Sequence, residues 1–240
     1  MSPRRVLIIA HRGASAYAPE STQAAIQTAV RLQADMIELD VQLTRDHRLV
    51  IFHDERLERT TNGTGELIRQ RYAALARLDA GAWRSPRFAG ERILLVSQAL
   101  KLIPRRCRVN LELKRTTHPQ LLLRQLARCL RWTRSLQQVL LSSFHPSLLA
   151  LSKRAQPRVA TALLCRRHPY QALQQALRLG CVALHPHASL VTPALVQQTH
   201  AAGLRLHAWT IHRLQEARRL IRFGVDGLVT NRPDLLGSAS

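Results

Sequence analysis

The feature that most constrains this chain is a regular alternation of short apolar segments with longer amphipathic ones. Eight apolar segments have strand character, and they span 5–10, 35–41, 108–113, 139–144, 158–164, 181–186, 204–210 and 226–233. Helical patterns lie between them at 19–32, 95–103, 119–132, 146–155, 169–179, 193–202 and 212–223. Eight such units favour an α/β fold with a closed (β/α)8 barrel, a TIM barrel, over an open doubly wound sheet.

One long segment interrupts this alternation. The run "RLVIFHD", residues 48–54, follows the second strand after a short turn that contains His47, so the two runs are expected to pair as a hairpin. The residues from about 54 to 92 are rich in arginine and glycine, and they are too many for an ordinary connection. We therefore predict a single barrel domain over residues 1–240 with a small insertion at about 54–92 after the second strand and its hairpin.

The formal net charge of +21 comes almost entirely from arginine. A nucleic-acid-binding protein would concentrate such charge on one face or tail, often among aromatic residues. Here the arginines spread from Arg4 to Arg232, and aromatic residues make up only 4% of the chain. We expect no nucleic-acid partner and interpret the charge as a solvated basic surface. Attraction to anionic substrates and peripheral contact with an anionic membrane are the alternatives, and the oligomeric state is left open.

The expected compartment follows from a search for targeting segments and from the pattern of cysteines. No apolar run is long enough to span a membrane, and the one that follows "MSPRR" is too short for a signal peptide. The four cysteines are scattered, with no C-x-x-C and no metal-like spacing. We therefore expect a cytoplasmic protein whose thiols are reduced.

Polar residues interrupt the apolar segments near the carboxyl ends of the predicted strands, where a barrel of this kind carries its catalytic groups. In "ELDVQLTRDHRLVIFHDE", residues 38–55, two acids come two positions apart. Residues at that spacing on a strand share one face. Glu38 and Asp40 should therefore point together into the barrel mouth, while Ile37, Leu39 and Val41 pack the other way.

The next strand adds Glu112 and Lys114 at the same spacing. Three carboxylates at one mouth repel one another unless a cation lies among them, and oxygen ligands suit Mg²⁺ or Ca²⁺. No H-x-H or H-E-x-x-H spacing indicates zinc. Arg12 and Lys114 beside such a site indicate an anionic ligand, most naturally a phosphate. His11 and His53 can supply a general acid and a general base near neutral pH.

Six segments carry a family resemblance: "AHRGASAYAPEST", "ELDVQLTRDHRLVIFHDERLERTTNGTG", "LELK", "SSF", "AWT" and "GVDGLVTNRP". In this order, from about residue 8 to 233, they resemble the glycerophosphodiester phosphodiesterases of the cytoplasmic bacterial type. The resemblance implies a barrel with a small insertion. It also implies divalent-metal-dependent hydrolysis of small-molecule glycerophosphodiesters to an alcohol and sn-glycerol 3-phosphate.

The resemblance also implies roles for individual positions: His11 and His53 as the acid–base pair, Glu38, Asp40 and Glu112 as metal ligands, Arg12, Lys114 and Glu20 as phosphate-binding or other polar groups, and Phe144 and Trp209 as aromatic walls. The chain departs from the family pattern at Asn231, where Asp is frequent, and at 94–98, where "LLVSQ" replaces an acidic run. We expect neither departure to touch the metal or acid–base set.

Several alternatives stay open at this point. The glycerol 2-hydroxyl attacks phosphorus in the route we favour, with direct attack by water as the competing route, and the sequence does not say which histidine is the first base. A lysophospholipase D would use the same site with an apolar surface, for which residues 66–90 offer candidates. A relative of the phosphatidylinositol-type phospholipases C would stop at the cyclic product. A non-catalytic protein that binds anionic ligands is the remaining alternative.

Overall fold

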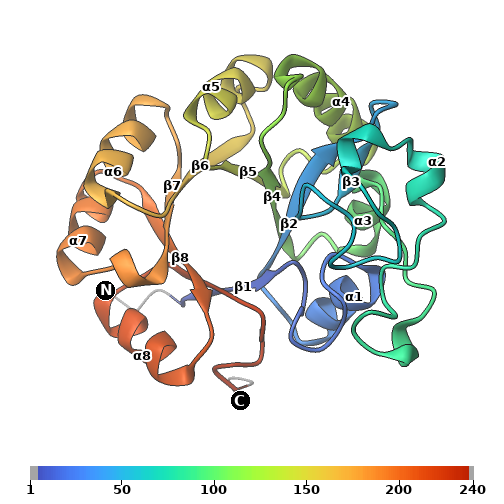
Figure 1. Cartoon of the computed structure of the whole chain (residues 1–240). Coiled ribbons are helices and arrows are strands. Elements are labelled where there is room, and N and C mark those ends of the chain that lie inside the picture. The colour runs from blue at the N-terminus through green and yellow to red at the C-terminus, as the bar shows by residue number, and fades with distance from the viewer. Residues whose placement is uncertain (1–4, 238–240) are drawn as a thin grey trace.

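The structure, a computed structural model that describes residues 5–237, is built around a closed parallel barrel (Figure 1). Its strands are β1 (Leu7–His11), β2 (Met36–Leu43), β4 (Arg108–Leu113), β5 (Val139–Ser143), β6 (Ala160–Cys165), β7 (Ala183–Pro186), β8 (Arg205–Ile211) and β9 (Gly227–Thr230). β1 pairs with both β9 and β2, which closes the sheet into a ring. The predicted (β/α)8 barrel is confirmed.

Helices surround the barrel as an outer ring (Figure 1). They are α1 (Gln23–Arg31), α3 (Val96–Leu102), α4 (Pro119–Trp132), α5 (Pro146–Ala155), α6 (Pro169–Arg178), α7 (Pro193–Ala201) and α8 (Leu214–Phe223), with a 3-10 turn, η3 (Ala188–Leu190), before α7. Proline occupies the first turn of α4, α5, α6 and α7, where its missing N–H costs nothing. None of the helices in residues 5–237 combines the length and the apolar character that a membrane span requires.

The helix predicted from residue 19 begins four residues later. Ser21 has a φ of 62°, a left-handed conformation that a helix cannot contain. Thr22 then caps α1, since its side-chain oxygen accepts a hydrogen bond from the Ala25 amide. The residues between β1 and α1 therefore form a loop over the barrel mouth, and Ser21 N–H ties that loop to the Arg12 carbonyl at 2.9 Å.

The predicted hairpin is present, although its second strand is shorter than expected. β3 (Leu49–Ile51) pairs antiparallel with β2, and His47 lies in the connecting turn with a φ of 62°. The pairing stops after Ile51. Gln42, on β2, donates instead to the carbonyls of Phe52, His53 and Asp54 at 2.7–3.2 Å.

The segment after the hairpin has a small core of its own. It contains η1 (Leu67–Arg69), α2 (Tyr72–Leu75) and η2 (Pro86–Phe88), at the right of Figure 1. Its buried cluster comprises Val50, Phe52, Leu57, Leu67, Leu75, Ala80 and Ile93. The segment therefore packs on the outer face of the hairpin, and its own apolar residues hold it together.

Side-chain alternation along β2 places the site. Ile37, Leu39 and Val41 belong to the large hydrophobic cluster that the strands form with the surrounding helices. Glu38 and Asp40 are also buried, 4% and 1% exposed, but they face the other way, into the barrel. The predicted division of this strand between side chains that pack outward and side chains that face the barrel interior is confirmed.

Candidate active site

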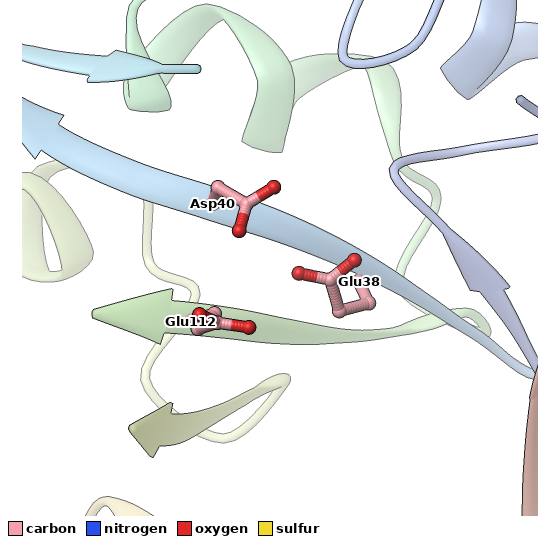
Figure 2. A group of neighbouring side chains, drawn as sticks. All are labelled: Glu38, Asp40 and Glu112. Carbon is pink, nitrogen blue, oxygen red and sulfur yellow. The ribbon is translucent and has the colours of Figure 1, made fainter. Parts of the chain in front are cut away.

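The register between neighbouring strands determines which side chains lie together at the candidate site. In the parallel ladder His11 of β1 is the partner of Glu38, and Asp40 is the partner of Glu112 on β4. Paired residues on neighbouring strands share one face, so these side chains converge at the carboxyl end of the barrel. Figure 2 shows the three acids directed toward one another from two adjacent strands.

The three carboxylates fit a hard cation. One oxygen from each of Glu38, Asp40 and Glu112 lies within 4.8 Å of the others. Glu38 Oε1 and Asp40 Oδ2 are buried without a hydrogen-bond partner in the described part of the chain. Such orphaned acceptors are costly in a folded protein unless a ligand completes them. Burial, then the charges of its two neighbours, raises the pKa of Glu38 well above its usual range. A divalent ion would remove this repulsion.

Two cations border the cluster, as the sequence predicted. Lys114 Nζ lies 3.2 Å from Asp40 Oδ1 and 2.9 Å from Glu112 Oε1. Arg12 Nε lies 3.4 Å from Asp40 Oδ2, which is an ion pair without hydrogen-bond geometry. Burial opposes ionisation of Asp40, but Lys114 and Arg12 lower its pKa nonetheless. Asp40 is thus the carboxylate that is ionised most readily.

Arg12 also acts through its backbone. Its φ of 55° is in the left-handed region, which arginine rarely adopts, and its N–H donates to Glu38 Oε2 at 3.0 Å. Gly13 follows with a φ of 81°, and a Cβ there would lie 2.7 Å from the backbone of Ala25 in α1. The strained turn is therefore held by close packing on α1, and it fixes a carboxylate of the cluster.

His11 has a neutral partner. Its Nδ1 lies 2.7 Å from Asn231 Oδ1, and its Nε2 lies 3.9 Å from Glu38 Oε2. Burial, followed by the charge of Arg12, lowers the pKa of His11 to about 4. The expectation that Asn231 would not touch the acid–base set was wrong, because the loop after β9 returns to the mouth beside β1.

His53 has a charged partner. Its Nδ1 lies 2.5 Å from Asp54 Oδ1, and Arg59 donates to the other oxygen of Asp54. Arg59 also holds both oxygens of Glu20, at 2.7 and 2.9 Å, and Glu20 in turn accepts from Arg12 at 2.9 Å. Burial lowers the pKa of His53 below its usual value, although the charge of Asp40 and the hydrogen bond to Asp54 oppose this shift. A continuous series of polar contacts therefore connects His53 to Arg12 through Asp54, Arg59 and Glu20.

Comparisons with known proteins decide the family. Residues 11–235 match the model of the glycerophosphoryl diester phosphodiesterase family. The chain belongs to this family. A glycerophosphodiester phosphodiesterase of Caldanaerobacter subterraneus subsp. tengcongensis is 37% identical, and the alignment covers 97% of this chain and 96% of that one. One of Bacillus subtilis is 31% identical over 98% and 86%.

A solved structure resembles the barrel closely. It is an Oleispira antarctica phosphodiesterase in complex with the product sn-glycerol-3-phosphate, with a TM-score of 0.89 and 31% identity, and the match covers 95% of this chain and 93% of that one. Family membership at these identities identifies the chain as a phosphodiesterase.

The two predicted aromatic residues do line the cavity at the mouth, which His11, Arg12, Glu38, His53, Glu112 and Lys114 also line. The rings of Phe144 and Trp209 meet edge to face with their centroids 5.4 Å apart. The Arg166 guanidinium lies over both, 4.8 Å from the first ring and 5.3 Å from the second. Glu20 is not among the cavity-lining residues, since it lies behind Arg12 and orients it.

Several cavity residues were missed. Arg166, at the carboxyl end of β6, carried a usable signal, since the first residues after barrel strands face the mouth. Asn110 is two positions before Glu112 and therefore on the same face of β4, and its side-chain oxygen is buried without a partner among the described residues. His185 also lines the cavity, and its Nε2 is buried without a hydrogen-bond partner within residues 5–237.

Proposed function

We propose that this phosphodiesterase hydrolyses small glycerophosphodiesters to an alcohol and sn-glycerol 3-phosphate, and that the reaction depends on one divalent cation, Mg²⁺ or Ca²⁺. The observation that carries the proposal is the converging set of Glu38, Asp40 and Glu112 with its orphaned buried oxygens. All three ligands are carboxylates, which these hard ions prefer. The glycerol phosphate product held by the Oleispira relative supports the substrate class.

The cation, when bound, would neutralise the three carboxylates and polarise a phosphoryl oxygen. Arg12 and Lys114 would bind the other phosphate oxygens, because both are aimed at the cluster and neither can lose its charge there. Glu20 and the Arg12 backbone turn fix the direction of this guanidinium. Phe144 and Trp209 would border the glycerol.

The hydrogen-bond partners of His11 and His53 suggest different roles for the two histidines, one as general base and the other as general acid. Burial and the charge of Arg12 favour the neutral form of His11, and the Asn231 amide oxygen at its Nδ1 leaves the Nε2 lone pair free. The Asp54 carboxylate instead supports the charged form of His53. We propose that His11 takes the proton of the glycerol 2-hydroxyl as that oxygen bonds to phosphorus. His53 then gives its proton to the departing alcohol oxygen as the bond from phosphorus to that oxygen breaks.

The resulting cyclic phosphate is opened by water, with the proton transfers reversed, to give glycerol 3-phosphate. Internal attack of this kind gains an effective molarity of about 10⁵ M or more when well aligned, and acid–base groups add roughly 10²–10⁴-fold. A substrate without the 2-hydroxyl distinguishes the routes. We expect it to be inert, and its hydrolysis at a normal rate would establish direct attack by water.

The lysophospholipase D alternative loses its main support. Of the large apolar side chains of residues 66–90, Leu67, Tyr72, Leu75 and Leu78 belong to the small core of the insertion or pack against it. Ile68 and Trp83 are 38% and 40% exposed. The non-catalytic alternative is disfavoured by the complete acid–base and carboxylate set. The cytoplasmic location, the membrane contact and the single-domain boundary stay predictions.

Purified protein incubated with glycerophosphoethanolamine and with glycerophosphocholine tests the proposal. We expect glycerol 3-phosphate to appear with Mg²⁺ or Ca²⁺ and to be lost with a chelator. Glu112→Gln keeps the side-chain volume and should lower the rate at least about 100-fold, because it removes a ligand charge. Release of choline phosphate or of a cyclic product as the end point would instead favour a phospholipase C-like reaction.

A further inference from the structure

A second cavity adjoins the candidate active site, and no role has been assigned to it. Five residues line both cavities: His53, Glu112, Lys114, Phe144 and Arg166. Beyond these residues it adds Arg115, directly after Lys114, and Glu55, which follows the His53–Asp54 pair. A diester whose phosphate lies between His53 and Lys114 would place one of its two arms in this cavity.

The basic side chains of the second cavity differ in whether a carboxylate of residues 5–237 pairs with them. Lys114 is engaged by Asp40 and Glu112. Arg115 and Arg166 are both exposed, and neither forms an ion pair with any carboxylate of the described residues. Two free guanidinium groups therefore face one free carboxylate, that of Glu55. Guanidinium groups bind carboxylate and phosphate through paired hydrogen bonds.

The aromatic rings at the mouth, those of Phe144 and Trp209, are already covered by the guanidinium group of Arg166. Recognition of a quaternary ammonium group uses open aromatic faces. The guanidinium of Arg166 lies over Phe144 and Trp209 at 4.8 and 5.3 Å from their centroids. A choline group that approached these rings would have to displace Arg166 or accept its repulsion.

We infer that the second cavity is the subsite for the alcohol of the diester, and that Arg115 and Arg166 select alcohols that carry an anionic group. That group is a carboxylate or a phosphate, and quaternary ammonium alcohols are disfavoured. The inference rests on the proposed function, which supplies the reaction, and it adds the class of alcohol.

Two pairs of substrates isolate the anionic group. Glycerophosphoserine differs from glycerophosphoethanolamine by one carboxylate, and phosphorylated glycerophosphoglycerol differs from its parent by one phosphate. We expect kcat/KM to favour the anionic member of at least one pair by about two- to fivefold, the range of an exposed charge pair. The pair that shows the preference identifies carboxylate or phosphate as the recognised group. Glycerophosphocholine should be the poorest substrate.

Variants tie the preference to the cavity. Arg115→Gln should abolish most of the preference by raising KM for the anionic member of the pair. Arg166→Gln should lower the preference and also raise kcat/KM for glycerophosphocholine, because it uncovers two aromatic faces, whereas Arg166→Lys should keep part of the preference. Arg218→Gln, at an exposed arginine of α8 that lines neither cavity, removes the same charge and should leave the preference intact.

Three results would overturn the inference while leaving the proposed function standing. They are equal kcat/KM within both pairs, a preference for glycerophosphocholine, and equal effects of Arg115→Gln and Arg218→Gln on the preference. Absence of glycerol 3-phosphate from every diester would contradict the proposed function itself and the inference with it.

Discussion

Asp54 Oδ1 lies 2.5 Å from Nδ1 of His53, the residue that precedes it in the chain. The Nδ1 of His11 instead meets the amide oxygen of Asn231, and the Glu38 carboxylate is 3.9 Å from the Nε2 of this ring. A carboxylate stabilises the imidazolium form of its partner, and an amide does so far less. On this asymmetry between two histidines of one site we propose that His53 is the acid and His11 the base.

The assignment predicts a dependence on the leaving group. The alcohol of a natural diester needs a proton as it departs, whereas p-nitrophenolate leaves readily without one. We expect His53→Ala to lower kcat about 10²–10⁴-fold on glycerophosphoethanolamine. The decrease should be much smaller on a glycerophosphodiester whose leaving group is p-nitrophenolate. His11→Ala should lower kcat by similar factors on both substrates. The opposite pattern in the steady-state rates of the two variants would exchange the roles.

Arg59 should matter for catalysis although it does not line the cavity. It holds Asp54 and Glu20 together, and these residues orient His53 and Arg12. We expect Arg59→Gln to lower kcat about 10-fold or more, with the limb of the pH–rate profile that reports His53 displaced. Arg69→Gln is the matched control, because Arg69 lies in the same insertion and pairs with Glu66 at the surface. If both variants behave alike, Arg59 has no special role in positioning.

The turn after Arg12 should be intolerant of any side chain. Gly13→Ala adds a Cβ at 2.7 Å from the Ala25 backbone to a residue with a φ of 81°, whereas Gly90→Ala meets no atom within 4 Å at a φ of 95°. The conformational penalty is similar, about 1 kcal/mol, but only the first variant also clashes. We expect urea denaturation to show that Gly13→Ala loses at least about 1 kcal/mol more than Gly90→Ala. Equal losses would mean that this loop moves freely.

The stability of the barrel should fall in acid because of buried neutral histidines. His207 is 3% exposed and packs against His185 with ring centroids 4.7 Å apart. Burial lowers the pKa of His207 to about 4 from 6.5. Between these values the unfolded chain binds more protons, so the free energy of unfolding declines as the pH falls from 6.5 toward 4.

His207→Gln should flatten this decline by an amount on the order of 2 kcal/mol. Denaturant titrations at pH 7, 5.5 and 4.5 measure the slope for the variant and the parent. The exposed His212 provides a control, since His212→Gln should leave the slope unchanged. Parallel curves for His207→Gln and the parent would show that His207 is not the source of the acid sensitivity.

Features that depend on neighbouring residues in the sequence can be predicted from it, whereas features that depend on residues far apart in the sequence cannot. α4 and α5 span the predicted residues because proline and apolar spacing act locally. Glu38 and Asp40 share a face by strand alternation alone. In contrast, the contact of His11 with Asn231 joins residues 220 positions apart, and closure of the barrel between β1 and β9 creates it. No local pattern carries that information.

The same reasoning separates the site residues that were predicted from those that were missed. Arg59 belongs to an insertion whose path over the mouth follows from its own small core, which the sequence showed only as an arginine-rich interruption. Arg166 could have been found from its place after β6, but its position over Phe144 and Trp209 requires the completed ring of strands.

We propose that the barrel carboxylates Glu38, Asp40 and Glu112 hold the ion on which hydrolysis depends. Stepwise addition of Mg²⁺ or Ca²⁺ to metal-free protein, with bound ion and glycerol 3-phosphate release measured in the same samples, tests it most directly. We expect activity to rise in proportion to one bound ion per chain, and Glu112→Gln to bind the ion weakly and to remain inactive. Full activity before any ion is bound, or unchanged binding by Glu112→Gln, would contradict the claim.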